Sequence, residues 1–261
     1  MNTTAYLERI GYIGSIEPTL ETLSNLHEAH LRTVPFETLD LHLGISINLE
    51  TVALECKIVQ NRRGGWCYEL NALFAELLHT LGFDVRLKMC QPTKGDGTLS
   101  PAFGHLALKV LLEGQEFLVD VGFGQDFRDP LELCEGVQGE CLLERDDHFW
   151  LYSRRTREGD WKLQFRIDPE EYALEDFLEM CNFYQHSSES GFRKHSFCGV
   201  HTSEGYSYLS DRTLTLEGKV RKSETVLEPG EIGPLLLERF GVDLSEGQLE
   251  RLRGTWRKRG V

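Results

Sequence analysis

The chain has 261 residues, of which 40% are hydrophobic and 27% charged, and its formal net charge is −14. This composition is typical of a globular protein, and no apolar run approaches the roughly 20 residues that cross a bilayer. Because binding to nucleic-acid phosphates requires a basic face, the acidic balance argues against nucleic acid as the main partner. The amino-terminal residues lack the basic and apolar regions of a secretory signal, so we expect a cytoplasmic protein with no membrane role.

The cysteine and histidine spacing indicates neither a disulfide framework nor a metal site. Seven cysteines, an odd number, are spread along the chain, and no two have the short C-x₂₋₄-C spacing of a zinc site. His27 and His30 are three residues apart on a predicted helix, but no carboxylate or cysteine stands at a matching helical offset on that face. We therefore expect these histidines to pack against other side chains or to cap a helix end, and we expect no bound metal.

The first part of the chain is predicted to be helical. One helix begins after Thr19, a residue type that caps helix starts, and ends at the Val-Pro step at 34–35. A second helix begins at Cys67, shortly after the Gly-Gly pair at 64–65, and carries apolar residues at a 3.6-residue period up to Gly82. Cys67 therefore lies in the first turn of this helix.

From about residue 84 the pattern changes to short alternating segments, which predict an antiparallel sheet or barrel. The predicted strands lie near residues 85–89, 105–112, 117–121, 149–153 and 161–167. Turn signals at 113–115 and 157–160 predict two hairpins.

After residue 169 the signals are mixed. A helical segment carries Leu174, Phe177 and Leu178 on one face. Strand patterns follow at 206–209 and 213–216. A terminal helix is then expected to open at Asp243 or Ser245.

Cys67 is the candidate nucleophile. The N–H groups of a first helical turn have no intrahelical partners, and the positive end of the helix dipole lies there, so an anion is favoured. A thiolate at this position is stabilised relative to a thiol. The plain alternative is that Cys67 is a small buried hydrophobe, which is the usual role of a lone intracellular cysteine.

The first predicted hairpin offers Cys67 a base and a group to orient that base. If the chain turns about Gly114, His105 faces Gly122 across the strands, and Asp120 is its diagonal neighbour on the same face. Asp120 then fixes the tautomer of His105 and favours its protonated form, while His105 faces the thiol. Taken singly, His105 is better explained as a solvated strand end and Asp120 as a turn residue. Together with Cys67, they favour a papain-like Cys-His-Asp site.

Three stretches of the chain resemble signatures of the arylamine N-acetyltransferases. The stretch around the cysteine reads Arg-Gly-Gly-Trp-Cys-Tyr-Glu-Leu-Asn over 63–71. Val-Pro-Phe-Glu-Thr-Leu-Asp over 34–40 and Val-Asp-Val-Gly-Phe-Gly over 119–124 resemble the other two signatures, and all three occur in family order. Residues 161–165 and 182–184 are also similar, so the resemblance covers nearly the whole chain.

The resemblance implies an α+β fold built around a papain-like Cys-His-Asp core. It implies a helical N-terminal domain that carries the cysteine, an antiparallel β-barrel domain that carries the histidine and aspartate, and a C-terminal α/β lid. On this chain we place them at residues 1–84, 85–195 and 196–261. The helical and strand patterns above agree with this division.

The resemblance also implies an activity. Cys67 would take an acetyl group from acetyl-CoA in a ping-pong reaction and pass it to an aromatic amine or hydrazine, as in xenobiotic metabolism. Acetyl-CoA is then a co-substrate, and no permanently bound cofactor is expected. By the same resemblance Phe36 and Phe123 line the aromatic pocket, for which core packing is an equal alternative, and Gly122 and Gly124 let the CoA arm approach. The backbone N–H of Cys67 is the expected oxyanion donor.

The chain departs from the family pattern at three places. Thr38 stands where the family usually has Asn, which we expect to weaken hydrogen bonding at that loop. Residues 185–192 differ from the family's Ser-Thr-His-Pro-x-Ser-x-Phe segment, and residues 125–130 lack its further glycines. Both segments lie toward the CoA side, so the donor stays open between acetyl-CoA and a longer acyl-CoA.

Three alternative functions fit the same residues. A papain-like thiol amidase or hydrolase would pass the acyl group to water, and an amide synthase of secondary metabolism would accept a carrier-bound acyl chain. A non-catalytic binding module is less expected, because it has no need of all three triad residues. The preferred amine, the oligomeric state and the physiological role stay open.

Overall fold

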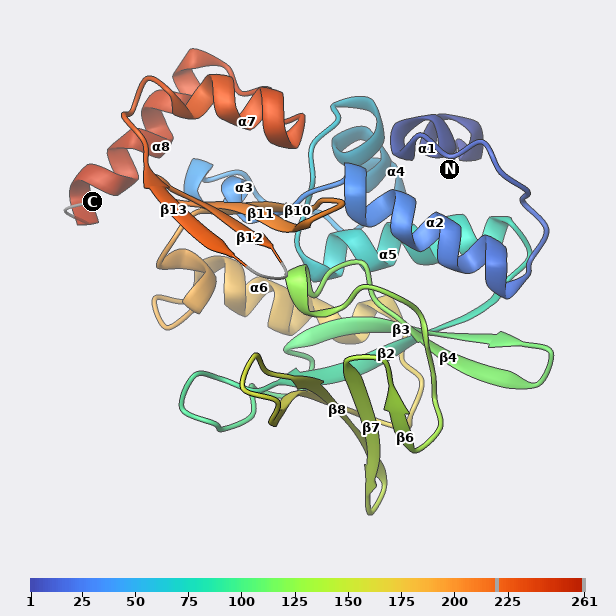
Figure 1. Cartoon of the computed structure of the whole chain (residues 1–261). Helices are drawn as coiled ribbons and strands as arrows, with labels where there is room; N and C mark the ends of the chain where they lie inside the picture. The colour runs from blue at the N-terminus through green and yellow to red at the C-terminus, as the bar shows by residue number, and fades with distance from the viewer. Residues whose placement is uncertain (219–220, 260–261) are drawn as a thin grey trace.

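The computed structural model describes residues 1–218 and 221–259 of the chain. Its amino-terminal part is helical, as predicted (Figure 1). The elements here are α1 (Thr3–Ile10), α2 (Leu20–Thr33), α3 (Leu39–Leu43), α4 (Thr51–Leu54), the π-helical segment η1 (Glu55–Gln60) and α5 (Cys67–Thr80). Most side chains of α5 are buried, so packing on several sides sets the position of this helix.

The two helices predicted from a capping threonine, a proline and a glycine pair are confirmed. The side chain of Thr19 accepts a hydrogen bond from the backbone N–H of Thr22 at 3.2 Å, which caps the start of α2. Val34, in extended conformation before proline, ends the helix. Helix α5 begins at Cys67 itself, so this residue lies in the first turn.

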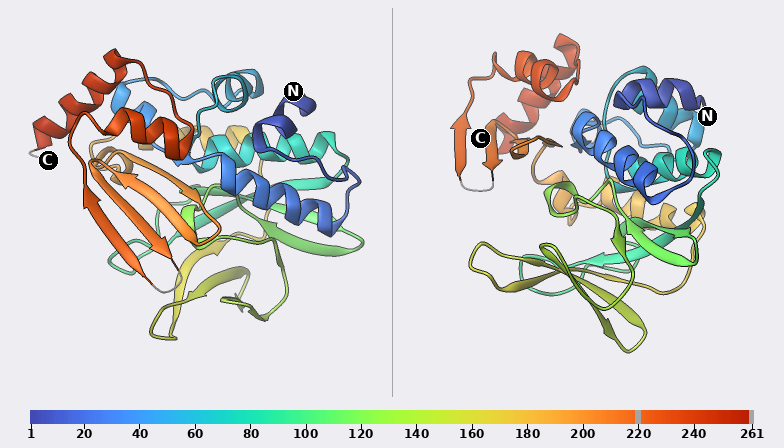
Figure 2. Two further views of the ribbon diagram at one scale, coloured as in Figure 1. Left: turned by 45° about the horizontal axis from the view of Figure 1, so that its top comes forward. Right: turned by 45° about the vertical axis from the view of Figure 1, so that its right-hand side comes forward.

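The predicted antiparallel sheet is confirmed as an eight-stranded sheet in the order β5-β4-β3-β2-β9-β8-β7-β6. Its strands are β2 (Asp84–Pro92), β3 (His105–Leu112), β4 (Gln115–Val119), β5 (Leu131–Glu132), β6 (Gly136–Gln138), β7 (Cys141–Asp146), β8 (Phe149–Arg155) and β9 (Trp161–Ile167). Strands β2 and β3 contact α5, and the sheet twists away from the helices toward β6–β8 (Figure 2). One buried cluster, which includes Leu118, Tyr152 and Phe165, joins strands along this sheet. The sheet is therefore barrel-like, with the cluster as its core.

The β3–β4 hairpin turns at Glu113 and Gly114, both with positive φ (50° and 83°). Such a turn matches the twist of the paired strands. Leu112 pairs with Gln115 and Leu108 with Val119. Continued beyond the ladder, this register places residue 105 opposite residue 122, as predicted from the turn.

The chain returns to the helical side after β9. It forms the 3₁₀ turn η3 (Leu174–Phe177), helix α6 (Leu178–His186) and the 3₁₀ turn η4 (Gly191–Arg193). Phe177 is fully buried against the α5 core, but the side chain of Leu178 is 48% exposed. The prediction of one shared face was therefore wrong at Leu178, because the tighter 3₁₀ turn changes the helical period just before it.

A five-stranded antiparallel sheet, in the order β1-β10-β11-β12-β13, forms the opposite end of the molecule. Its strands are β1 (Phe36–Glu37), β10 (Phe197–His201), β11 (Gly205–Ser210), β12 (Thr213–Gly218) and β13 (Lys222–Val226). Helices α7 (Ile232–Phe240) and α8 (Glu246–Arg259) cover one face (Figure 1). Strand β1, from the amino-terminal part, pairs with β10 and so joins the first signature to this sheet.

The division into domains at residues 84 and 195 stays a prediction. Within residues 1–218 and 221–259, no helix has both the length and the apolar character needed to cross a membrane. In the same part of the chain, no cluster of histidine, cysteine and carboxylate side chains is arranged to hold a metal ion. His27 and His30 are buried, and His30 Nδ1 lies 2.9 Å from the hydroxyl of Tyr6. All seven cysteines are free thiols.

Candidate active site

Cys67 lies at a cavity of about 520 Å³ between the two sheets and the start of α5. All four of the predicted ligand-binding residues line this cavity: Phe36, Phe123, Gly122 and Gly124. Four further aromatic residues also line the cavity, namely Phe192, Phe197, Tyr206 and Tyr208. The cavity is therefore suited to a flat apolar group that reaches toward a thiol.

The hairpin brings His105 and Asp120 into contact. His105 Nε2 lies 2.5 Å from Asp120 Oδ2, and both side chains are buried. Burial by itself lowers the pKa of His105, but the Asp120 carboxylate and the hydrogen-bonded Cys67 thiol outweigh it and raise the pKa to about 10. The imidazole is therefore protonated at neutral pH. With Nε2 directed at Asp120, the other ring nitrogen, Nδ1, is left for Cys67.

Asn71 is a site residue that the sequence reasoning missed. Its Nδ2 donates to Asp120 Oδ1 at 2.8 Å and to the carbonyl of Leu106 at 2.7 Å, while its Oδ1 accepts from the N–H of Val121 at 3.0 Å. Asn71 is fully buried. A signal was available, because residue 71 stands one helical turn after Cys67 on the same face of α5, where a buried amide needs partners.

Hydrogen bonds also fix the backbone around Asp120. The N–H of Gly122 donates to Asp120 Oδ1 at 2.8 Å. On the other side, Nε2 of the buried His27 donates to the carbonyl oxygen of Asp120 at 2.9 Å. Burial lowers the pKa of His27, so its ring is neutral and carries one donor, which this carbonyl uses. The carboxylate thus has one oxygen for His105 and one for Asn71 and Gly122.

Gly122 is required by the packing of Cys67. A Cβ atom on this residue would lie 2.6 Å from Cys67 Cα and 2.9 Å from Asn71 Nδ2, and neither atom can move freely. The sequence reasoning expected this glycine to make room for a CoA arm. The structure shows that the thiol-bearing residue itself occupies the space beside it, and a contact with CoA stays a prediction.

We expect Gly122→Ala to slow the alkylation of Cys67 by iodoacetamide at neutral pH by roughly 10²-fold, the scale of a reacting group displaced by about 1 Å. The methyl group pushes Cys67 Cα away from the hairpin that carries His105. Peptide mass spectrometry of the alkylated cysteine gives the rate. Gly230→Ala is the matched control, because Gly230 is exposed and nothing lies within 4 Å of its added Cβ. Equal rates in the two variants would contradict this account.

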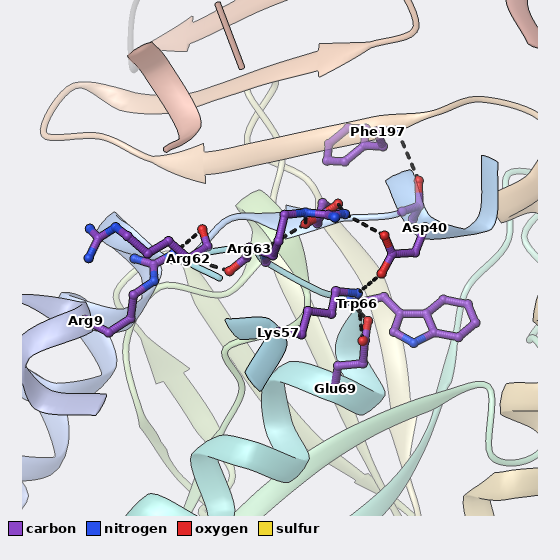
Figure 3. A network of polar contacts seen from close by, with 11 residues as sticks. Arg9, Asp40, Lys57, Arg62, Arg63, Trp66, Glu69 and Phe197 are labelled. Carbon is purple, nitrogen blue, oxygen red and sulfur yellow. Dashed lines mark hydrogen bonds and ion pairs between the residues drawn. The ribbon is translucent and has the colours of Figure 1, made fainter. Parts of the chain in front are cut away.

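A buried ion network lies beside the start of α5, above the helix in the view of Figure 3. Arg63 Nε and Nη2 each lie 2.7 Å from a different oxygen of Glu37, and Nη2 also lies 2.7 Å from Asp40 Oδ1. Lys57 Nζ bridges Asp40 at 2.7 Å and Glu69 at 2.8 Å. Burial raises the pKa of Asp40, but Lys57 and Arg63 outweigh it and hold the pKa below its usual value. Asp40 therefore keeps its charge at neutral pH, whereas at Glu69 burial outweighs the effect of Lys57 and raises the pKa of the carboxyl.

This network fixes the turn that presents Cys67. Glu37 Oε1 accepts from the N–H of Gly64 at 2.9 Å, and Glu69 Oε2 accepts from the N–H of Trp66 at 3.2 Å. A Cβ on Gly64 would lie 1.9 Å from the carbonyl oxygen of Pro35, so only glycine allows the two signatures to pack this closely. The first two signatures therefore form one structural unit around the cysteine.

Thr38 forms hydrogen bonds at its loop, and the predicted weakening relative to Asn stays a prediction. The hydroxyl of Thr38 accepts from the N–H of Phe197 at 3.1 Å, and the N–H of Thr38 donates to the carbonyl of Phe197 at 2.9 Å. Thr38 is buried, and a short hydroxyl reaches β10 because the β1–β10 pairing brings the two backbones together. Thr38 thus adds one side-chain and one backbone hydrogen bond to the pairing of β1 with β10.

The chain matches known proteins along most of its length. The family profile described as N-acetyltransferase covers residues 19–249. The pineal gland arylamine N-acetyltransferase isozyme NAT-10 of Gallus gallus is 31% identical, over 94% of this chain and 95% of that protein. Arylamine N-acetyltransferase 1 of Homo sapiens is 32% identical, over 82% of this chain and 83% of that protein.

Solved structures agree with these sequence matches. The arylamine N-acetyltransferase of Salmonella typhimurium superposes with a TM-score of 0.90 at 30% identity, over 97% of each chain. That of Mycobacterium marinum, solved in complex with CoA, superposes with a TM-score of 0.90 at 27% identity, over 97% of this chain and 99% of that one.

Proposed function

Since this chain belongs to the arylamine N-acetyltransferase family and is an acyltransferase, we propose that Cys67 carries the acetyl group as a thioester between acetyl-CoA and an aromatic amine or hydrazine. One observation supports this most directly. His105, with a pKa raised to about 10, lies between the buried carboxylate of Asp120 and the thiol of Cys67. The positive charge of this imidazolium beside the sulfur favours nucleophilic attack by Cys67.

In the first half-reaction the thiolate of Cys67 attacks the carbonyl carbon of the acetyl thioester. The negative charge that develops on oxygen meets the N–H groups of the first turn of α5, and the N–H of Cys67 is the expected donor. When the tetrahedral intermediate collapses, the carbon–sulfur bond to CoA breaks, and His105 gives its proton to the departing CoA sulfur. The enzyme is left as acetyl-Cys67 with neutral His105.

In the second half-reaction the amine nitrogen attacks the acetyl carbon on Cys67. His105 Nδ1 takes one proton from the attacking amine, and the bond between the carbon and Cys67 breaks to release the amide. The thiolate and the imidazolium are then restored together. Asp120 keeps Nε2 protonated throughout, so Nδ1 is the nitrogen that gives and takes the proton.

The cavity supports an aromatic acceptor. Phe123 packs edge-on against His105, with ring centroids 5.1 Å apart, and Phe36 packs against Phe197 at 5.9 Å. An aromatic amine between these rings directs its nitrogen toward the base. The Mycobacterium marinum relative binds CoA, and we propose acetyl-CoA as the donor here. A cytoplasmic location and a role in the metabolism of foreign aromatic amines belong to the same proposal.

The test is intact-protein mass spectrometry after incubation with acetyl-CoA alone. We expect one added acetyl mass on Cys67, lost on addition of an aromatic amine, and no adduct on Cys67→Ser or Cys67→Ala. The other six cysteines, of which Cys56 and Cys134 are exposed, are internal controls. No adduct, or an adduct elsewhere, would overturn the proposal. Fast loss of the adduct without amine would instead indicate a hydrolase.

A further inference from the structure

The residue two positions before His105 has an unusual backbone conformation. Phe103 has a φ of 61°, in the left-handed region that bulky side chains rarely adopt. This conformation is unfavourable for a residue with a side chain, so it persists only where neighbouring contacts enforce it, and such residues gather at functional sites. The contacts of Phe103 therefore indicate what the conformation is for.

Contacts on both the carbonyl and the ring enforce the conformation of Phe103. The hydroxyl of Tyr68 donates to the carbonyl oxygen of Phe103 at 2.7 Å. The ring of Phe103 packs edge-on against Tyr172 and Phe177, with centroids 5.0 and 5.2 Å apart. Tyr68 and Phe177 are fully buried, so neither side chain has room to move away from Phe103.

The turn that leads into His105 is tight. The N–H of Gly104 donates to the carbonyl oxygen of Pro101 at 3.1 Å, and a Cβ on Gly104 would lie 2.9 Å from that same oxygen. His105 then forms the last pair of the β2–β3 ladder, opposite Cys90. Phe103 is thus a fixed point just beyond the ladder, where the end of a strand otherwise frays.

Tyr68 joins this fixed point to the helix that carries the nucleophile. It directly follows Cys67 in the first turn of α5, whereas Phe103 lies two residues before His105. One hydrogen bond thus connects the cysteine helix to the chain that leads into the strand of the base. The β3–β4 hairpin holds His105 against Asp120, but it does not by itself set the distance to Cys67, because the cysteine belongs to another element.

We propose that Tyr68 and Phe103 are positioning residues that hold His105 at the distance from Cys67 that proton transfer requires. Asn71 connects α5 to the carboxylate that orients the base, and Tyr68 connects α5 to the chain beside the base itself. The two bonds therefore hold the histidine and its carboxylate from different sides. This inference rests on the proposed function, in which Cys67 attacks and His105 moves the proton.

The first test changes the backbone preference at residue 103. Phe103→Ala and Phe103→Gly both remove the ring, but only glycine takes a positive φ without steric cost. We expect iodoacetamide to alkylate Cys67 about five- to tenfold faster in Phe103→Gly than in Phe103→Ala at neutral pH. Peptide mass spectrometry gives each rate relative to that of the exposed Cys134 in the same sample. Because glycine at an ordinary position loosens the chain, a role in packing alone predicts equal rates or the opposite order.

The second test removes only the hydroxyl that holds Phe103. Tyr68→Phe should slow both the alkylation of Cys67 and its acetylation in a single turnover by about five- to tenfold, the effect of one hydrogen bond. The control is Tyr6→Phe, because Tyr6 is equally buried in the same core and its hydroxyl lies 2.9 Å from His30 Nδ1. All rates are measured well below the unfolding midpoints, and only Tyr68→Phe should change them.

Either of two results would overturn the proposal. One is a rate in Phe103→Gly no higher than that in Phe103→Ala. The other is a rate in Tyr68→Phe equal to that in Tyr6→Phe. Alkylation needs no acyl donor, so it tests the placement of His105 separately from the proposed function. Failure of wild-type Cys67 to take an acetyl group from acetyl-CoA would disprove the proposed function, whereas normal loading with either of these two results would disprove only the positioning role.

Discussion

Asp120→Asn is expected to lower the rate of Cys67 acetylation by acetyl-CoA on the order of 10³-fold or more, with little loss of stability. The new amide has only one favourable orientation. Its oxygen must face the donors Asn71 Nδ2 and Gly122 N–H, which now point at Asp120 Oδ1. The amide nitrogen then faces His105 Nε2 and donates to it.

That orientation forces the wrong tautomer on His105. If Nε2 accepts a hydrogen bond, the ring proton of the neutral imidazole lies on Nδ1, toward Cys67. The imidazole is then unable to take the proton of the thiol. The substitution also removes the charge that most strongly opposes the effect of burial on the pKa of His105, so that pKa falls.

The pH dependence of alkylation measures this directly. In the wild type the imidazolium beside Cys67 is present through neutral pH and loses its proton only as the pH rises through its raised pKa of about 10. We expect a nearly flat rate of Cys67 alkylation by iodoacetamide between about pH 7 and pH 9, a range that lies between the ordinary pKa of histidine and the raised pKa of about 10. In Asp120→Asn the rate should be low and rise steadily with pH. A wild-type rate and profile in the variant would make Asp120 purely structural.

Arg63→Met is expected to destabilise the protein by about 3–5 kcal/mol, the usual cost of removing one partner from a buried ion pair. Glu37 and Asp40 would keep their buried carboxylates without the guanidinium that now contacts both. The loss is measured by urea unfolding. We also expect slower acetylation of Cys67, because the turn at Gly64 depends on Glu37 being held in place.

The control is Arg32→Met on the surface of α2. Arg32 pairs with Glu28 at 2.6 Å, but both side chains are about half exposed, and such pairs contribute only about 0–1 kcal/mol. The two substitutions remove the same functional group from an ion pair. If they lower the free energy of unfolding equally, the buried network does not stabilise the start of α5.

Local signals were sufficient for the elements that carry the site. A capping threonine and a proline define α2, a glycine pair followed by helical periodicity places Cys67 at the start of α5, and a two-residue turn sets the β3–β4 register. Each signal acts over a few residues, where backbone sterics and hydrogen bonding decide the conformation. For this reason the approach of His105 to Asp120 was predictable, since it depends only on hairpin register.

Contacts between distant segments were not predictable in the same way. The pairing of β1 with β10 brings Thr38 to Phe197, 159 residues away in sequence, and no local pattern indicates this partner. The buried network of Arg63 and Lys57 joins three carboxylates from two distant segments in the same manner. Such contacts depend on which surfaces pack together, and residue spacing within one segment carries no information about that.

The sequence by itself determined the nucleophile, its base and the orienting carboxylate as candidates, because each stands in a local pattern with a known geometry. Only the tertiary structure decided how they are held. Asn71 pairs with Asp120 across the junction of helix and sheet, and the packing of Cys67 excludes any side chain at residue 122. The cavity beside Cys67 is lined by residues from two sheets, and that enclosure exists only in the folded chain.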